Sequence, residues 1–375
     1  MEPFKNQVGP ALVARVGQHL QRVWPAFARR RFESTATEGL EALALKARVL
    51  HLALALEATL PDDFDRAAAV LEAALAPAGA DDDPSLPPDT DAGLAGWAVW
   101  PLAEFVARRG IDHPQRALAA LHALTQRWTA EWALRPFIER HPDLAFATLQ
   151  RWAADPSVHV RRLASEGSRP RLPWGLRLQS LVRDPAPTLP LLRRLQDDPS
   201  AYVRRSVANH LNDIAKDHPA VVADWLDEHL PGAGAERRTL LRHASRSLIK
   251  QGDRRVLAAW GLDRPLRGEV QLQLAPTRAL LGGELTLNVT LHSTAAKAQK
   301  LAVDYALHHV KADGTLSPKV FKGWTQTLAA HEQRVLVKRH SLRPVTVRHY
   351  HAGRHALELL VNGRVVASAH FDLGL

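Results

Sequence analysis

The chain has 375 residues, and its 49 Lys and Arg exceed its 39 Asp and Glu, which gives a formal net charge of +10. The absence of cysteine excludes disulfides, thiolate metal sites and a cysteine nucleophile, and no uncharged stretch of about 18 residues exists that could span a membrane. The length favours two or three domains, and the basic excess favours a polyanionic partner, with nucleic acid ahead of an anionic membrane.

Helical patterns fill the first part of the chain. Residues 8–31 are expected to form one or two amphipathic helices, residues 39–60 a helix rich in Ala and Leu, and residues 62–75 a further helix. Residues 77–91 lack periodicity and contain consecutive aspartates and a Pro-Pro pair, which predicts a loop or a disordered insertion. The residues from Met1 to Asn6 do not resemble a signal peptide, and a cytoplasmic, nucleoid-associated location is expected.

From Gly93 onward, prolines separate short segments in which apolar residues recur at helical spacing. One stretch occurs twice, as DPSVHVRRLASE at residues 155–166 and as DPSAYVRRSVAN at residues 198–209. The interval between the copies matches the period of about 40–47 residues of HEAT-like helical repeats. In each copy Asp-Pro ends one helix and Ser can cap the next. Residues 8–262 are therefore predicted to form an α-solenoid whose last unit is residues 238–250.

The two copies share an Arg-Arg pair but differ in the acidic residue that follows it. In the first copy Arg162 and Glu166 are one helical turn apart, and a solvated ion pair is one interpretation. Glu166 is matched by Asn209 in the second copy, which instead favours a shared basic surface with a carboxylate placed differently in each repeat. The second copy is expected to have an apolar stripe of Val203, Val207, Leu211 and Ile214 beside a polar face of Arg205, Asn209, Asn212 and Asp213.

After residue 265 the pattern changes to alternation of apolar and polar residues. Strands are expected at residues 268–274, 284–291, 301–307, 334–339, 355–360 and 365–371, and Asn362-Gly363 is a strong hairpin signal. About seven short strands favour a small immunoglobulin-type β-sandwich, with a lipocalin-like barrel as the alternative. The predicted architecture is mainly α: a solenoid domain of HEAT-like repeats over residues 1–263, followed by an all-β immunoglobulin-like domain over residues 266–375.

Two aromatic segments are candidate functional sites. Arg169, Arg171 and Trp174 lie in a connection stiffened by prolines, where Trp174 either fills a gap between repeats or presents its ring and the neighbouring arginines to DNA. Trp128 and Trp132 share one helical face and flank Glu131, which lies about 100° away from that face. The sequence has no zinc-binding histidine motif, no glycine-rich phosphate loop and no Gly-x-Ser-x-Gly elbow, although His349 and His351 are a weak candidate for zinc.

The residues from Val160 to Trp174 and from Val203 to Asp213 resemble the AlkC branch of the AlkC/AlkD DNA alkylation-repair glycosylases. The resemblance covers the solenoid in style and is specific over about residues 125–260. The appended β domain is similar to that of AlkC proteins with an immunoglobulin-like carboxy-terminal domain. The resemblance implies a monofunctional glycosylase that removes cationic N3-alkylated bases from duplex DNA, chiefly 3-methyladenine, with 3-methylcytosine as an open question. It also implies recognition without deep base flipping, and neither a metal nor a cofactor.

By position, the resemblance places the catalytic carboxylates at Glu166 and Asp213, with Glu131 as a third, and the aromatic residue beside the lesion at Trp174. A positively charged base needs no strong general acid to leave, and a carboxylate near C1′ can stabilise the oxocarbenium-like sugar and orient water. The candidates for binding DNA phosphates are arginines of the repeats and of the Trp174 connection, namely Arg161, Arg162, Arg169, Arg171, Arg204, Arg205, Arg242 and Arg246. A monomer acting on double-stranded DNA is expected, while a non-catalytic DNA-binding scaffold and a protein-interaction module remain as alternatives.

Overall fold

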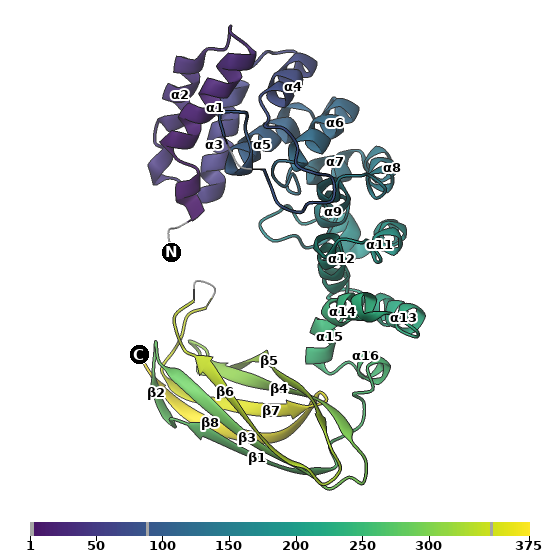
Figure 1. Cartoon of the computed structure of the whole chain (residues 1–375). Helices are drawn as coiled ribbons and strands as arrows, with labels where there is room; N and C mark the ends of the chain where they lie inside the picture. The colour runs from purple at the N-terminus through teal and green to yellow at the C-terminus, as the bar shows by residue number, and fades with distance from the viewer. Residues whose placement is uncertain (1–3, 88–89, 346–347) are drawn as a thin grey trace. The chain divides into compact units, whose positions relative to one another are not determined.

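The structure is a computed structural model that describes residues 4–87, 90–345 and 348–375. Helices precede strands along the chain (Figure 1). The chain divides into two compact units. The first, here called the repeat unit, comprises the residues up to Asp217 together with Gly234–Ala244, and the second, the sandwich unit, comprises His218–Ala233 and Ser245–Leu375.

The repeat unit is built from short helices joined by tight connections. Its α-helices are α1 (Pro10–Val23), α2 (Arg29–Thr37), α3 (Leu45–Glu57), α4 (Phe64–Ala73), α5 (Val99–Arg109), α6 (Pro114–Thr125), α7 (Arg135–Arg140), α8 (Pro142–Trp152), α9 (Val158–Gly167), α10 (Gln179–Arg183), α11 (Leu189–Leu195), α12 (Ala201–Ile214) and α14 (Ala235–Ala244). The 3-10 turns η1 (Phe4–Gln7), η2 (Leu40–Ala42), η3 (Gly96–Ala98) and η4 (Ala186–Thr188) lie among them in the described part of the chain. Proline opens α1, α6 and α8, because its fixed φ suits the first helical turn and it has no N–H to leave unpaired.

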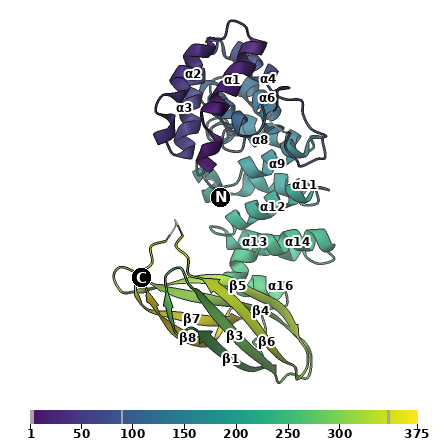
Figure 2. The same ribbon diagram turned by 60° about the vertical axis from the view of Figure 1, so that its left-hand side comes forward.

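The two copies of the repeated sequence form α9 and α12, which lie side by side in both ribbon views (Figures 1 and 2). The predicted apolar stripe of α12 is confirmed, since Val203, Val207, Leu211 and Ile214 are all buried. Ser200 caps α12 by accepting from the Tyr202 backbone N–H, whereas Ser157 makes no side-chain cap for α9. Asp155 and Asp198 instead hold the backbone N–H of the following serine, each at 2.9 Å.

The predicted loop at residues 77–91 is a loop in its described part, and residues 88–89 lie outside the described residues. Its two ends are joined, because the Ala76 backbone N–H donates to Leu94 and the Leu94 N–H donates to Ala74. Farther along, the Asp81 carbonyl accepts from the Val158 N–H at 2.6 Å. The Asp81 carbonyl of the loop thus caps the first backbone N–H of α9, the helix that carries Arg161 and Arg162.

The sandwich unit contains two β-sheets. Its strands are β1 (Gly268–Ala275), β2 (Arg278–Leu280), β3 (Glu284–Ser293), β4 (Gln299–Val310), β5 (Leu316–Leu328), β6 (Gln333–Ser341), β7 (Gly353–Val361) and β8 (Arg364–Gly374), in sheets ordered β1-β3-β6 and β2-β8-β7-β4-β5. Leu285, Leu287 and Val289 of one sheet and Leu357 and Leu359 of the other belong to one buried core. Two separate sheets replace the alternative of a closed barrel, and the sequence had not predicted β2 or β5.

Three helices group with the sandwich: α13 (Pro219–His229), α15 (Arg246–Gln251) and α16 (Arg254–Ala259). Gly252, after α15, meets Gly363 in the turn between β7 and β8 so closely that a Cβ on Gly363 would lie 2.7 Å from the Gly252 Cα. Asn362 is buried and donates to the Arg264 carbonyl at 2.9 Å. The change from helix to strand falls near the predicted boundary at residues 263–266. The second segment of the compact sandwich unit nevertheless begins earlier, at Ser245, because residues after α15 pack against the turn between β7 and β8.

Candidate nucleic-acid interface

An alternating series of acidic and basic side chains connects the predicted catalytic carboxylates. Arg162 on α9 donates through Nη1 to Glu131 Oε2 at 2.5 Å and to the Thr129 hydroxyl at 2.8 Å. Its Nη2 lies 3.6 Å from Glu166 Oε1, one turn along the same helix. The Tyr202 ring of α12 packs against this guanidinium, with 5.3 Å from the Arg162 Cζ to the ring centroid.

The series continues through Glu166 to Asp213. Arg169 donates to Glu166 Oε1 at 2.6 Å and, through Nε, to Asp213 Oδ2 at 2.8 Å. Ser206 donates to Glu166 Oε2 at 2.6 Å, and Lys216 donates to Asp213 Oδ1 at 2.8 Å. Glu131, Arg162, Glu166, Arg169 and Asp213 therefore form one connected set, here called the acid–arginine chain.

Burial corrects two expectations about these residues. Asp213 and Asn212 are 1% and 3% exposed, so they do not lie on a solvated polar face of α12. Glu166 is 6% exposed, so its contact with Arg162 is not a solvated surface pair. The polar-face prediction was wrong for these residues because Arg169 packs against α12, and a buried carboxylate that has an opposite charge and hydrogen bonds can be accommodated.

The surroundings of Glu166 act on its pKa in opposite directions. Burial raises the pKa, because the charged form loses water, but Arg162, Arg169 and the Ser206 hydroxyl all favour the carboxylate. Their combined effect places the pKa of Glu166 below its ordinary value. Glu166 is consequently a buried, ionised carboxylate that lies between the guanidinium groups of Arg162 and Arg169.

The three carboxylates differ in how many of their oxygens are already bonded. Both oxygens of Glu166 and both of Asp213 have donors within 2.8 Å. The bonds of Glu131 to Arg162 and to the Thr129 hydroxyl both use Oε2, and within the described residues its Oε1 accepts no hydrogen bond. Glu131 is therefore the carboxylate with an oxygen left for a water molecule or a substrate.

Arg135, which the sequence analysis did not single out, holds the connection that carries Trp174. It is 0% exposed and donates to the carbonyls of Leu176 at 2.5 Å, Gly167 at 2.9 Å and Arg169 at 2.8 Å. Burial, followed by the nearby charge of Arg169, lowers the pKa of Arg135 to about 10, so it remains a cation at neutral pH. A signal for it in the sequence was weak, since an arginine before a proline at a helix start is usually at the surface.

Trp174 does not fill a gap between repeats, because 56% of it is exposed. Its backbone has φ of +61°, a left-handed conformation that is unfavourable for a large side chain. Lys46 donates to the Trp174 carbonyl at 2.7 Å, and the Trp132 indole donates to the Pro173 carbonyl at 3.1 Å. The ring lines a cavity of about 400 Å³ together with Trp100 and Trp132, whose rings stack with centroids 4.3 Å apart.

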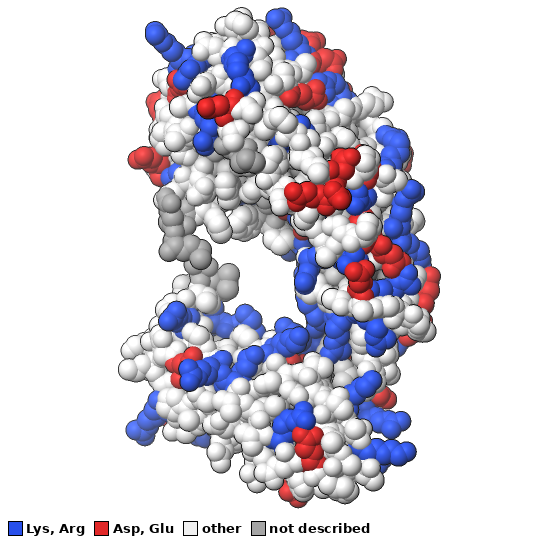
Figure 3. All heavy atoms as spheres, viewed as in Figure 1, with Lys and Arg blue, Asp and Glu red and all other residues white. Residues whose placement is uncertain are grey.

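Most of the arginines predicted to bind phosphates have carboxylate partners. Besides Arg162 and Arg169, Arg161 pairs with Asp198 at 2.7 Å, Arg171 with Asp217 at 2.6 Å and Arg204 with Glu236 at 3.1 Å. On the face drawn in Figure 3, basic and acidic side chains lie next to each other at several places. The sequence could not show these last three pairs, because the partners lie about 30–46 residues farther along the chain. These arginines are thus partly neutralised within the protein, and their contact with DNA stays a prediction.

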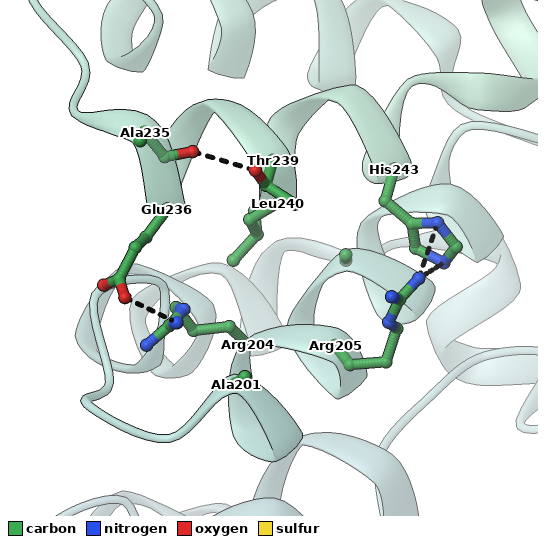
Figure 4. Close-up of a pocket in the computed structure, with 9 residues that line it drawn as sticks. Ala201, Arg204, Arg205, Ala235, Glu236, Thr239, Leu240 and His243 are labelled. Atoms are coloured by element: carbon green, nitrogen blue, oxygen red, sulfur yellow. Dashed lines mark hydrogen bonds and ion pairs between the residues drawn. The ribbon is translucent and has the colours of Figure 1, made fainter.

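Arg205 differs from that group. It is exposed and approaches His243 of α14, with its Nη1 3.1 Å from Nδ1 of the ring (Figure 4). Arg242 lies in the last turn of α14, Arg246 begins α15, and both are half-buried. That Arg242 and Arg246 contact DNA phosphates stays a prediction.

The described residues contain no group of three or more His, Cys, Asp or Glu that could hold a metal ion. This covers His349 and His351, the weak zinc candidate of the sequence. None of the helices in the described part of the chain is long and apolar enough to cross a bilayer.

The chain is similar to known proteins over its whole length. The family described as "DNA alkylation repair enzyme" matches residues 124–248, and "Uncharacterised protein YhaZ, C-terminal Ig-like domain" matches residues 269–375. The uncharacterized protein YhaZ of Bacillus subtilis is 34% identical, with 100% of both chains covered. The structure of Pseudomonas fluorescens alkylpurine DNA glycosylase AlkC, bound to DNA containing an abasic site analog, matches with a TM-score of 0.91, 36% identity and 100% of both chains covered. The chain therefore belongs to the AlkC branch of the DNA alkylation repair family, with a C-terminal immunoglobulin-like domain.

Proposed function

We propose that the protein is a monofunctional DNA glycosylase that hydrolyses the N-glycosidic bond of cationic alkylated bases in duplex DNA. The observation that carries this proposal is the position of Glu131, whose carboxylate is fixed by Arg162 and Thr129 through one oxygen while the other accepts no hydrogen bond within the described residues. The similarity to AlkC, whose structure is bound to DNA containing an abasic site analog, supports DNA as the partner.

In this proposal Glu131 acts on the sugar and on the attacking water. An alkylated base that is already positively charged leaves as a neutral molecule, so the reaction needs little general acid catalysis. The deoxyribose develops positive charge at C1′, and a preorganised carboxylate stabilises that charge and orients the water. Because Arg162 and Thr129 fix Oε2, the geometry of Oε1 is set before substrate arrives, and little reorganisation is required during the reaction.

Glu166 and Asp213 take supporting roles. Glu166 stays ionised between Arg162 and Arg169, so it holds in place the guanidinium that orients Glu131. Asp213 fixes Arg169 from the other side. The three carboxylates implied by the family resemblance are thus assigned one direct role and two positioning roles.

We further propose 3-methyladenine as the chief substrate, with 3-methylcytosine as a second candidate, and recognition without deep flipping of the base. The exposed ring of Trp174 supports this, because a flat aromatic surface can lie against a cationic base through a cation–π contact of about 0.5–2 kcal/mol. The protein would act as a monomer at the nucleoid, with residues 1–263 carrying the chemistry and residues 266–375 assisting.

The test is to incubate the purified protein with duplex DNA that carries 3-methyladenine and to measure free base by chromatography. A monofunctional glycosylase releases the base and leaves an intact strand with an alkali-labile abasic site. The alternative function is a non-catalytic DNA-binding scaffold, which would bind the duplex and release nothing. A parallel incubation with Glu131→Gln separates enzymatic release from spontaneous depurination.

A further inference from the structure

Arg162 and Arg205 occupy the same position in the two copies of the repeat, but carboxylates surround Arg162, whereas an imidazole contacts Arg205. Arg162 lies beside two carboxylates, those of Glu131 and Glu166. In the second copy the position of Glu166 is taken by Asn209. One repeat thus neutralises its arginine, whereas the other places an uncharged amide where the carboxylate would be.

Arg205 is held by a histidine in place of a carboxylate. Its Nη1 lies 3.1 Å from His243 Nδ1, and His243 Nε2 lies 2.9 Å from Asn209 Oδ1. A guanidinium N–H can only donate and an amide oxygen can only accept, so a neutral ring protonated at Nε2 satisfies both of these contacts. The imidazole therefore orients Arg205 without cancelling its charge, and Arg205 has no ion pair within the described residues.

The arginine faces a cavity of about 220 Å³ between α12 and α14, lined also by Arg204, Glu236 and Thr239 (Figure 4). Glu236, the acidic residue of this lining, pairs with Arg204 at 3.1 Å. Arg204 in addition donates to the Asp198 and Pro199 carbonyls. The wall formed by Arg204 and Glu236 is internally balanced, and the net positive charge of the cavity comes from Arg205.

We propose that the cavity formed by Arg205, His243 and their neighbours on α12 and α14 is a binding site for one phosphodiester group of the DNA backbone. A planar guanidinium with unneutralised charge matches a phosphate through two parallel N–H···O bonds. The proposal rests on the proposed function in that the phosphate belongs to duplex DNA. It adds His243 and Asn209 as the residues that orient Arg205 without neutralising its positive charge.

The experiment measures binding of a fluorescein-labelled, undamaged duplex by anisotropy over a series of salt concentrations. Arg205→Gln removes the cation, and Asn209→Glu restores at the second repeat the carboxylate that the first repeat has. Each variant should lower the slope of log K against log salt by about 1 and weaken binding roughly five- to tenfold near 0.1 M salt. Arg237→Gln is the matched control: it removes a positive charge from α14, but one that Asp197 already neutralises, so the slope should stay that of the wild type.

Slopes and affinities equal to those of the wild type in both Arg205→Gln and Asn209→Glu would overturn the site. Asn209→Glu keeps Arg205 in place, so it gives a result even if removal of the arginine disturbs the fold, and thermal unfolding checks both variants. Base release from methylated DNA is measured separately. DNA binding with the expected slope changes but without base release would refute the glycosylase and leave the phosphate site standing.

Discussion

Arg162 lies between two carboxylates from different parts of the chain, 2.5 Å from Glu131 and 3.6 Å from Glu166. Glu131 is on the connection before α7, and Glu166 is on the same helix as Arg162. The guanidinium of Arg162 consequently links Glu131, whose Oε1 accepts no hydrogen bond within the described residues, to Glu166, whose two oxygens both accept hydrogen bonds. This relationship separates the direct role from the supporting role and can be examined with conservative substitutions.

The first prediction concerns Glu131. Glu131→Gln should lower the single-turnover rate of base release by about 10²–10³-fold, the range found when one preorganised stabilising group is removed. Binding of undamaged duplex should change little, since a neutral amide replaces a carboxylate that is not a phosphate contact. Asp213→Asn is the comparison: both Asp213 oxygens hold cations, so it should lower thermal stability more than the rate at matched folded protein. A Glu131→Gln enzyme with the wild-type rate would remove Glu131 from the mechanism.

The second prediction concerns Glu166 and pH. The pKa of Glu166 is lowered in the folded protein, so its ionisation stabilises the fold above the unfolded-state pKa of about 4.3. That contribution is lost as pH falls through the lower folded-state pKa. Glu166→Gln should therefore lower the free energy of unfolding by about 3–5 kcal/mol at pH 7, because it leaves buried guanidinium groups without their partner.

The measurement is denaturant unfolding of the wild type and of Glu166→Gln between pH 7 and pH 3. The difference in unfolding free energy between the two proteins should shrink once the pH is below the ordinary range for glutamate. A difference that is constant over the whole range would show that the charge of Glu166 does not contribute to stability.

The repeat and the sandwich could be predicted from the sequence because their signals are local. The recurring Asp-Pro-Ser with Arg-Arg, the apolar spacing of Val203 and Val207, and the Asn362-Gly363 turn each fix a structure over a few residues. β5 was missed because it contains Pro318 and Gly323, which weaken a strand pattern, and it tolerates them as an edge strand.

The site was only partly predictable, because its contacts join residues far apart in sequence. Glu131, Glu166 and Asp213 were identified as candidates, but their burial and their order along Arg162 and Arg169 depend on the packing of neighbouring repeats. The sequence signal for Arg135 was weak, since nothing local shows that its guanidinium meets several carbonyls of a later connection. The pairing of Arg161 with Asp198 likewise appears only when α9 and α11 are adjacent.

The third prediction concerns Arg135 and the connection it holds. Arg135→Leu leaves several buried carbonyls without a donor and should destabilise the repeat unit by about 3–5 kcal/mol. Arg135→Lys keeps the charge but cannot reach the same set of carbonyls, so it should be milder for stability yet still loosen residues 168–178. Hydrogen exchange of amides in this segment is the readout. Protection unchanged in Arg135→Lys would show that the connection is held by other contacts.

The fourth prediction concerns the backbone of Trp174. Its φ of +61° is unfavourable by about 1–2 kcal/mol for a residue with a Cβ, and its exposed ring contributes little burial. Glycine relieves this strain and alanine does not. Denaturant unfolding should therefore show Trp174→Gly to be more stable than Trp174→Ala by roughly 1 kcal/mol. Both should lower the preference for damaged over undamaged duplex to the same extent, because both remove the ring. Full preference in both variants would exclude contact between Trp174 and the lesion.

The fifth prediction concerns the sandwich domain and its attachment. Truncation after Asp263 removes Gly363, against which Gly252 and Leu257 pack. The repeat unit should remain folded, since its own core ends at Ala244, whereas residues 245–262 should become sensitive to proteolysis. Excision should fall through weaker capture of damaged DNA, because the removed domain carries exposed lysines and arginines such as Lys319, Lys322 and Arg339.

A point substitution separates the loss of the domain from the loss of its attachment. Gly363→Ala adds a Cβ only 2.7 Å from the Gly252 Cα and 3.1 Å from Leu257, at a φ of +73°. Gly314→Ala has nearly the same backbone strain, at a φ of +77°, but its Cβ has nothing within 4 Å. If Gly363→Ala binds damaged DNA more weakly than Gly314→Ala does, the loss comes from the disturbed contact between Gly252, after α15, and the sandwich. Strain in the turn would not explain it, because both variants carry that strain. A truncated protein that folds and excises base at the full-length rate would show that the sandwich is not part of the DNA site, and that contact would then be purely structural.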